Sequence, residues 1–267
     1  MTTIKQLMNL RGRRALITGA TGNLGKVIAE SLAELGADLV LTDGPGVNFQ
    51  SLAEELRQQW SIDVQHRHCD LENKESRDEL ISWIATRFTN INILINNAAF
   101  VGTSELKGWA VPFEDQSIET WRRALEVNLT AAFDLCKGLA AILKVSQGAS
   151  IVNIASIYGE HGPDWSLYNN TNMSNPAAYG VSKGGLIQLT RWLSTTISPN
   201  VRVNTISPGG IFRNQNPIFL ERYGARTPLG RMANENDFRG AIAYLASDMS
   251  RYVTGQNLAV DGGWGVW

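Results

Sequence analysis

Residues 18–25, TGATGNLG, decide the fold because of the segments on either side of them. The stretch RALITG (14–19) is a short apolar run, as expected of a buried strand. The stretch LGKVIAESLAEL (24–35) carries an apolar stripe at helical spacing. A glycine-rich turn that leads from a strand into a helix can cradle a pyrophosphate at the helix N-terminus. The segment therefore predicts a dinucleotide-binding site.

The three glycines of this turn have different predicted roles. Gly19 permits the tight turn, Gly22 lets the phosphates approach, and Gly25 lets the helix pack closely on the strand. The predicted cofactor contacts of this turn are Gly19, Thr21, Asn23 and Leu24.

Strand-like runs alternate with helix-like segments along the whole chain. After the first strand, the predicted strands are 37–43, 64–71, 91–99, 150–156, 201–209 and 257–263. Such alternation is typical of a parallel sheet with helices on both faces. No linker, repeat or low-complexity run divides the chain. We therefore expect one α/β domain over residues 1–267, a doubly wound, seven-stranded parallel Rossmann fold.

Composition excludes several classes of protein. The 267 residues carry a net charge of −1, which gives no electrostatic footprint for nucleic acid or an anionic membrane. The N-terminus lacks the features of a signal peptide, and no apolar run is long enough to span a bilayer. Cys69 and Cys136 have no metal-binding spacing, and His66 and His68 alternate with Cys69 on a strand. We expect a cytoplasmic protein without a metal site.

The end of the second strand indicates which dinucleotide binds. Asp43 can accept both hydroxyls of the adenosine ribose, and it would repel a 2′-phosphate. Gly44, Pro45 and Gly46 follow it and supply no cation, so NAD(H) is expected rather than NADP(H). Asp70 and Leu71 close the third strand, where Asp70 either meets the adenine edge or is an ordinary polar strand end.

The segment YNNTNMSNPAAYGVSK (168–183) contains a candidate catalytic pair. Asn175 is expected to cap a helix with Pro176 in its first turn, so Tyr179 and Lys183 would share one helix face. A nearby ammonium favours a phenolate, so Lys183 is expected to lower the pKa of Tyr179. A tyrosine tuned in this way can exchange a proton with an alcohol or carbonyl oxygen. Tyr168 has no lysine four residues later.

Two further polar residues complete the candidate site. Ser156 ends the fifth strand and could bond the same substrate oxygen. Asn128 lies in a helical segment, where asparagine is a poor choice unless its side chain has a function.

With these residues in this order, the chain resembles the short-chain dehydrogenase/reductase family over nearly its whole length. The matching features are TGATGNLG, Asp43, Asp70, Asn96-Asn97-Ala98, Asn128, Ser156, Tyr179 with Lys183, Pro208-Gly209, and the tail TPLGRM…LASD…VTGQNLAVDGGW. The resemblance implies hydride transfer between a nicotinamide and a carbon that bears a hydroxyl or carbonyl, and commonly a homotetramer or dimer. It implies these roles: Tyr179 as acid/base, Lys183 on the nicotinamide ribose, Ser156 on the substrate, Asn128 on a relay water, and cofactor contacts at Asn97, Ala98, Pro208, Gly209 and Ile211.

The chain departs from the family pattern at three positions. Asn23 stands in place of the usual glycine, Ala99 in place of the glycine of an NNAG turn, and Arg213 in place of a threonine that bonds the carboxamide. The first departure is shared with the family's longer sugar-nucleotide epimerases and dehydratases, but these need a larger C-terminal domain. A non-catalytic nucleotide-binding regulator should have lost Tyr179 or Lys183, and both are present.

The long interval from Ser156 to Tyr179 is similar to a branch associated with flagellin modification and surface-polysaccharide sugar synthesis. Trp165 and Tyr168 are flat surfaces amid hydroxyl-bonding residues, so this insertion is predicted to bind a sugar or sugar phosphate over the nicotinamide pocket. Arg213, Arg222 and Arg226 could bind a phosphate or carboxylate. The alternatives are a solvated loop with ordinary ion pairs, and a general carbonyl or 3-oxoacyl-carrier-protein reductase.

Overall fold

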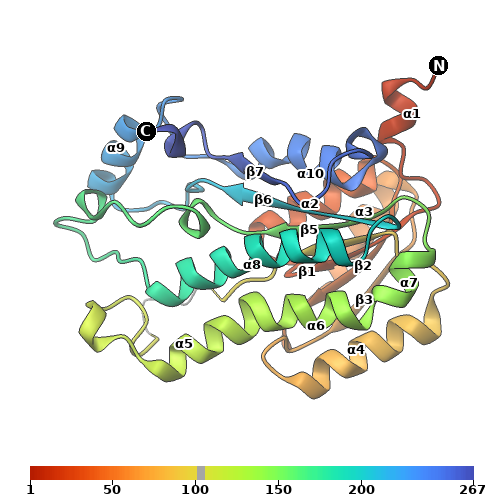
Figure 1. Ribbon diagram of the computed structural model, residues 1–267, viewed down its shortest axis with the longest axis horizontal. Helices are drawn as coiled ribbons and strands as arrows, with labels where there is room; N and C mark the ends of the chain where they lie inside the picture. Colours follow the sequence, from red (N-terminus) through yellow and green to blue (C-terminus); the bar gives the residue numbers. More distant parts are fainter. Residues whose placement is uncertain (101–105) are drawn as a thin grey trace.

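A parallel sheet forms the centre of the computed structural model, which describes residues 1–100 and 106–267 (Figure 1). In these residues the strands are β1 (Arg14–Thr18), β2 (Asp38–Asp43), β3 (Val64–His68), β4 (Ile93–Asn96), β5 (Ala149–Ile154), β6 (Val201–Pro208) and β7 (Asn257–Val260). Their order is β3-β2-β1-β4-β5-β6-β7, and every pair is parallel. The strand order reverses between β1 and β4, where open sheets of this kind form a ligand crevice at the carboxyl ends.

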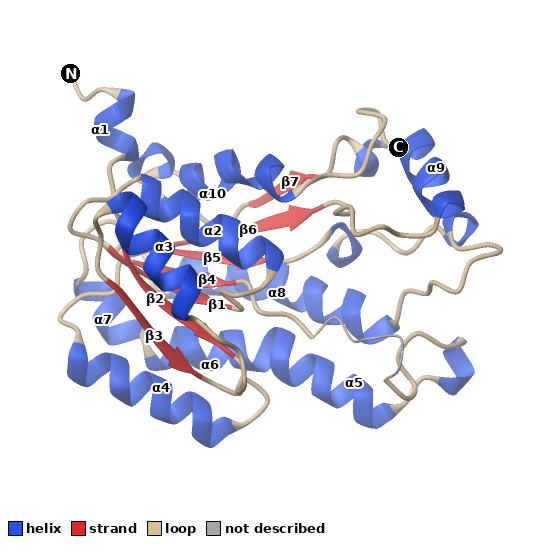
Figure 2. Ribbon diagram, turned by 180° about the vertical axis from the view of Figure 1, so that it is seen from behind, coloured by secondary structure: helices blue, strands red, loops and turns tan. Residues whose placement is uncertain are grey.

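Helices cover both faces of the sheet. They are α1 (Ile4–Met8), α2 (Asn23–Glu34), α3 (Gln50–Trp60), α4 (Lys74–Arg87), α5 (Ile118–Leu125), α6 (Ala131–Gly138), α7 (Ala140–Val145), α8 (Ala177–Thr196), α9 (Pro217–Arg226) and α10 (Arg239–Ala246). Helices α2, α3 and α10 lie on one side, and α4, α6 and α8 lie on the other (Figure 2). Helix α9 lies beyond the end of the sheet, beside the C-terminus (Figure 1).

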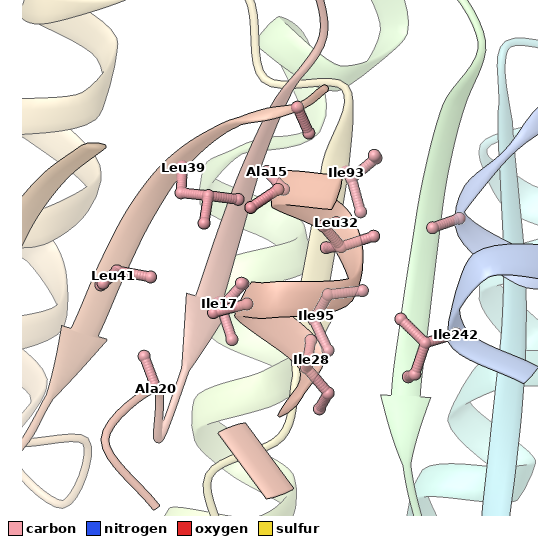
Figure 3. Packing of buried hydrophobic residues seen from close by; sticks show 14 of the residues in the cluster. Ala15, Ile17, Ala20, Ile28, Leu32, Leu39, Leu41, Ile93, Ile95 and Ile242 are labelled. Carbon is pink, nitrogen blue, oxygen red and sulfur yellow. The ribbon is translucent and has the colours of Figure 1, made fainter. Parts of the chain in front are cut away.

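Consecutive residues of β1 pack into two separate hydrophobic clusters, one on each face of the sheet. On β1, Leu16 joins the cluster under α4, α6 and α8, whereas Ile17 joins the cluster under α2 and α10. Figure 3 shows Ile17 facing Ile28 and Leu32 of α2, with Ile242 of α10 close by. All five side chains are fully or almost fully buried. Each such aliphatic side chain stabilises the fold by about 1.5–3 kcal/mol, so the apolar runs are consistent with strands covered on both faces.

The seven predicted strands and the doubly wound parallel sheet are confirmed. The predicted strands 64–71, 91–99 and 257–263 extend too far. The chain leaves the ladder after His68, Asn96 and Val260, and the segments after His68 and Asn96 enter the crevice. The predicted start of the helix that carries Tyr179 is also wrong. Pro176 is the N-cap, and the Ala177 amide that opens the helix donates to the Gln116 side chain at 3.0 Å.

The histidines of β3 and the cysteine that follows the strand alternate as predicted. His66 and His68 are exposed beside the Phe49 ring, each with a ring-centroid distance of 5.0 Å, and Cys69 is buried. Among the described residues, no group of three or more histidine, cysteine or acidic side chains could hold a metal ion. No helix in the same residues has both the length and the apolar character that crossing a bilayer requires.

Packing at Gly25 gives a test of the fold. A Cβ atom there would lie 2.0 Å from the Gly19 carbonyl oxygen, so Gly25→Ala forces the turn and helix apart. We expect a loss of about 2 kcal/mol or more in the free energy of unfolding, measured by urea denaturation. Gly240→Ala, at an exposed position of α10 with open space around the new methyl group, should raise stability by at most about 1 kcal/mol. Equal effects would contradict this packing.

Candidate active site

A cleft of about 1010 Å³ opens at the carboxyl ends of the strands. Every residue predicted to bind the cofactor lines it: Gly19, Thr21, Asn23, Leu24, Asp43, Asp70, Leu71, Asn97, Ala98, Tyr179, Lys183, Pro208, Gly209 and Ile211. Of the other predicted site residues, Ser156, Tyr168 and Arg213 line the cleft, whereas Asn128 and Trp165 do not. Most of the predicted site residues therefore lie in one cleft.

The glycine turn forms a cradle that has no room for a side chain. Gly19 has a φ of +62°, and a Cβ atom there would lie 2.8 Å from the Ala98 Cα atom. The Asn97 side-chain amide donates to the carbonyls of Thr18 and Gly19 at 2.9 and 3.0 Å, which ties the end of β4 to the turn. Helix α2 begins directly after Gly22 without a side-chain cap, so its N-terminus is available to an anion.

The carboxylate of Asp43 is fixed beside this turn. One oxygen accepts from the Thr21 amide at 2.9 Å and from the Thr21 hydroxyl at 2.7 Å, and the other accepts from the Gly44 amide at 2.9 Å. The carboxylate therefore has a defined position at the end of β2, where it can accept further hydrogen bonds from a ligand.

An ion pair that the sequence analysis missed lies further along the cleft. Arg123 of α5 donates to both carboxylate oxygens of Glu72 at 2.7 and 3.2 Å, and both residues line the cleft. The neighbouring Asp70 accepts from the Glu72 amide at 3.0 Å. Neither residue carries a sequence signal, because the pairing depends on how α5 packs beside the loop after β3.

Tyr179 and Lys183 lie one turn apart on α8, with Ser156 just after β5. The Lys183 ammonium is almost fully buried and donates to the Ile154 carbonyl at 2.8 Å, and it lies 5.7 Å from the centroid of the Tyr179 ring. The Ser156 hydroxyl oxygen accepts from the Tyr158 amide at 3.2 Å, so its own proton remains available for another acceptor.

The predicted direction of the Tyr179 pKa is wrong. Burial raises the pKa of Tyr179, the Ser156 hydroxyl offsets part of this change, and Tyr168 raises the pKa further. Burial also lowers the pKa of Lys183 to about 8. Removal from water disfavours both charged forms, and this effect outweighs the attraction that the sequence spacing suggested. Tyr179 is therefore a protonated phenol at neutral pH, the form that can donate a proton.

Asn128 supports the site from behind. It lies in a π-helical turn, Glu126–Thr130, between α5 and α6. Its side-chain oxygen accepts from the Phe100 amide, and its side-chain nitrogen donates to the Ser182 hydroxyl at 2.9 Å, which in turn donates to the Tyr179 carbonyl at 2.8 Å. These bonds are consistent with the prediction that the Asn128 side chain has a function inside a helical segment.

The long insertion contributes one of its two predicted aromatic residues to the cleft. Tyr168 lines the cleft and is 9% exposed, whereas Trp165 is 54% exposed and packs against the outer side of Tyr168. The asparagines at 169, 170 and 172 are exposed. Polar contact with the cleft comes instead from Ser174 and Asn175. The insertion therefore forms a wall of the cleft, with its asparagine-rich tip facing solvent.

The three arginines predicted to bind a phosphate all have partners within the protein. Arg213 pairs with Glu235 at 2.6 Å, Arg222 donates to the Asn169 carbonyl, and Arg226 pairs with Asp164 at 3.3 Å. These contacts favour the alternative of ordinary ion pairs. Arg222 and Arg226 join α9 to the insertion.

A family model described as enoyl-(acyl carrier protein) reductase matches residues 19–265. The chain belongs to the short-chain dehydrogenase/reductase family. Several members in this comparison are named as dehydrogenases or reductases, and the protein is an NAD(P)-dependent oxidoreductase.

Relatives of this short-chain dehydrogenase/reductase match it along nearly its full length. Post-translational flagellin modification protein A of Campylobacter coli is 29% identical over 259 residues, with 96% of this chain and 100% of the relative covered. NADPH-dependent 3-quinuclidinone reductase from Rhodotorula rubra has a TM-score of 0.87 at 26% identity, with 100% and 96% covered. A short chain dehydrogenase from Leptospira borgpetersenii with bound NAD⁺ has a TM-score of 0.82 at 31% identity, with 99% and 96% covered.

The cleft residues fit a nicotinamide dinucleotide. Gly22 and Asn23 line the cleft at the uncapped start of α2, where a pyrophosphate can bind, and Asp43 presents acceptors to a ribose. When bound, the cofactor supplies or accepts the hydride. We expect the Tyr179 phenol to donate its proton to the carbonyl oxygen of a substrate and to accept it in the reverse direction. The Ser156 hydroxyl would bond the same oxygen, and Lys183 would hold positive charge beside Tyr179.

The first test of this site concerns proton transfer. Tyr179→Phe removes the phenol hydroxyl that would exchange a proton with the substrate. We therefore expect kcat/KM to fall by about a thousandfold while NADH still binds. Steady-state kinetics and NADH fluorescence titration measure the two effects. Tyr168→Phe should keep measurable turnover. Full activity in Tyr179→Phe would remove this residue from the mechanism.

The second test uses the burial of Lys183. The unfolded chain holds the lysine proton up to about pH 10.4, whereas the folded protein loses it near pH 8, so wild-type stability rises with pH between these values. Relative to Lys183→Met, the wild type should gain about 2 kcal/mol in unfolding free energy from about pH 7.5 to about pH 10. The exposed Lys137→Met should show no such change relative to the wild type. A constant difference for Lys183→Met would disprove the lowered pKa.

Proposed function

We propose that this enzyme uses NAD(H) to interconvert a secondary hydroxyl and a carbonyl on a polyhydroxylated small molecule, such as a sugar of surface-glycan synthesis. The observation that carries the proposal is the lining of the substrate end of the cleft. It combines aromatic rings with phenol, hydroxyl and amide groups: Phe100, Trp109, Tyr158, Tyr168, Ser174, Asn175, Phe219 and Tyr223. Aromatic faces and hydrogen-bonding groups together suit a hydroxylated ring. The name of the Campylobacter relative supports a setting in surface modification.

The cations of the cleft favour an uncharged sugar over a sugar phosphate. In the described part of the chain, three cationic side chains line the cleft. Arg123 pairs with Glu72, Arg213 pairs with Glu235, and Lys183 is directed to a backbone carbonyl of β5. A phosphate would have to displace an existing partner, at a cost in free energy.

The preference for NAD(H) over NADP(H) rests on Asp43. Its carboxylate is held in place by Thr21 and Gly44 and faces the cleft at the end of β2. A 2′-phosphate at this position would meet a like charge in a fixed position. The solved relatives include an NADPH-dependent reductase and a dehydrogenase with bound NAD⁺, so support for the proposed preference comes from Asp43 and not from the relatives.

We also propose that the enzyme acts in the cytoplasm as a homodimer or homotetramer. Phe133 on α6 and Val181 and Trp192 on α8 are large apolar side chains with exposures of 42%, 51% and 55%. Contact with a second copy would remove such surface from water.

A turnover screen with both cofactors tests the proposed function. The panel contains neutral sugars, sugar phosphates, nucleotide sugars, ring alcohols, simple ketones and an oxoacyl thioester. We expect the highest kcat/KM with a neutral polyol and NAD⁺. The double variant Asp43→Ser with Gly44→Arg should shift the cofactor preference toward NADP⁺ by about tenfold or more, because the arginine can bind the 2′-phosphate. A Cβ atom at Gly44 meets open space, so the substitution fits.

The single variant Gly44→Arg is the matched control, and it should shift the preference less because Asp43 still repels the phosphate. A wild type that prefers NADPH would contradict the reading of Asp43. Activity confined to the thioester would identify a carrier-protein reductase instead.

A further inference from the structure

Two phenols meet in the wall of the cleft beside the catalytic residues. The hydroxyl oxygens of Tyr158 and Tyr168 lie 2.7 Å apart, and the Asn175 side-chain nitrogen donates to the Tyr168 hydroxyl at 3.4 Å. All three residues line the cleft. Tyr158 follows Ser156 after β5, whereas Tyr168 and Asn175 come from the far side of the insertion. The insertion therefore brings a second polar group to the reaction site.

A count of protons shows that Tyr158, Tyr168 and Asn175 together have one hydroxyl donor more than they use among themselves. We call it the spare donor. The two phenols carry two hydroxyl protons, and the bond between them uses one. Asn175 supplies a further proton to Tyr168 and takes none from either phenol. Whichever phenol donates to the other, one hydroxyl proton has no acceptor among the residues that the structure describes. A largely buried donor without an acceptor is costly, and an oxygen atom of a ligand in the cleft would satisfy it.

Tyr158 remains a donor over the working pH range. Burial raises the pKa of Tyr158 well above its ordinary value, and the adjacent Tyr168 raises it further. Tyr158 therefore does not act as a base near neutral pH. Tyr168 is 9% exposed and packs on the Phe219 ring at a centroid distance of 5.3 Å, so the pair is held in a fixed place. These properties suit recognition of a ligand and not proton transfer.

The phenol pair lies close to the reacting centre but is separate from it. The Tyr158 amide donates to the Ser156 hydroxyl at 3.2 Å, and Tyr168 is near enough to Tyr179 to raise the pKa of that phenol. An oxygen that exchanges its proton with Tyr179 is already bonded by Tyr179 and Ser156. The spare donor would therefore bind another oxygen of the same substrate.

We propose that Tyr158, Tyr168 and Asn175 form a recognition site for a second oxygen of the substrate, beside the hydroxyl or carbonyl that reacts. The inference rests on the proposed function and narrows it. The enzyme selects compounds that carry a further hydroxyl or ether oxygen near the reacting carbon, as in a ring polyol or sugar. Simple alcohols and ketones, which leave the donor unsatisfied, are poor substrates. A site built to bond a substrate hydroxyl discriminates strongly against an analogue that lacks it.

The test compares substrates that differ by one hydroxyl. Cyclohexanol and the cyclohexanediols share a ring, so their ratio of kcat/KM with NAD⁺ isolates the second oxygen. The wild type should prefer a diol by about tenfold or more, and the double variant Tyr158→Phe with Tyr168→Phe, which removes both hydroxyl protons, should reduce that preference to about twofold or less. Each single variant leaves one phenol with a free proton, so it should reduce the preference less. The fully exposed Tyr252→Phe is the matched control and should leave both substrates unchanged.

The outcomes separate recognition from a structural role. A loss of kcat/KM for the diol alone, with unchanged NADH affinity and far-ultraviolet circular dichroism, supports the site. An equal loss for diol and cyclohexanol overturns it, as does a wild type with no preference for any diol, and both results leave the oxidoreductase function standing. A wild type that oxidises no ring alcohol and no sugar overturns the proposed function and this site together.

Discussion

The backbone turn after β1 touches the backbone turn after β4, and the site is arranged around this contact. The space between Gly19 and Ala98 is too small for a Cβ atom, and the Asn97 amide bonds two carbonyls of the first turn. Because the strand order reverses between these two strands, their connections lead away in opposite directions and leave a crevice between them. The contact between Gly19 and Ala98 forms the bottom of that crevice.

A second constraint is a buried positive charge that pairs with no carboxylate of residues 1–100 and 106–267. Lys183 is 2% exposed, and its hydrogen bond is to the carbonyl of Ile154. Such a group gives up its proton more readily than a lysine in water. Its pKa is therefore sensitive to what enters the cleft, and a negative or strongly dipolar neighbour would raise that pKa again. Burial also raises the pKa of Tyr179 on the same helix, whereas it lowers the pKa of Lys183.

The fold and the cofactor half of the site could be predicted because they depend on local patterns. Apolar runs mark strands, and residues at strand ends such as Asp43 reach the crevice wherever the sheet is parallel. The substrate half could not be predicted in the same way. Trp165 and Tyr168 are equally aromatic in the sequence, but only the folded insertion turns Tyr168 toward the cleft. The importance of Tyr158 appears only when Tyr168 is placed beside it.

Electrostatics was the least predictable part of the site. The spacing of Tyr179 and Lys183 suggested attraction between an ammonium and a phenolate. A sequence does not show how completely a side chain is buried from water. The helix start was missed for a related reason. Gln116, which accepts from the first amide of α8, lies far from that helix in the chain. Both errors concern partners that only tertiary packing supplies.

Arg226 joins three segments that are distant in the sequence. Its guanidinium pairs with Asp164 of the insertion, lies 4.9 Å from the centroid of the Trp264 ring, and donates to the carbonyl of Trp267 at 3.1 Å. A ribosome makes the glycine turn, the insertion, α9 and this tail in that order. The strands β1 to β6 can thus be complete in a growing chain before α9 and the C-terminal tail are made. At that stage the insertion still lacks its contact with Arg226. During synthesis, the nucleotide half of the cleft can form before the half that selects the substrate.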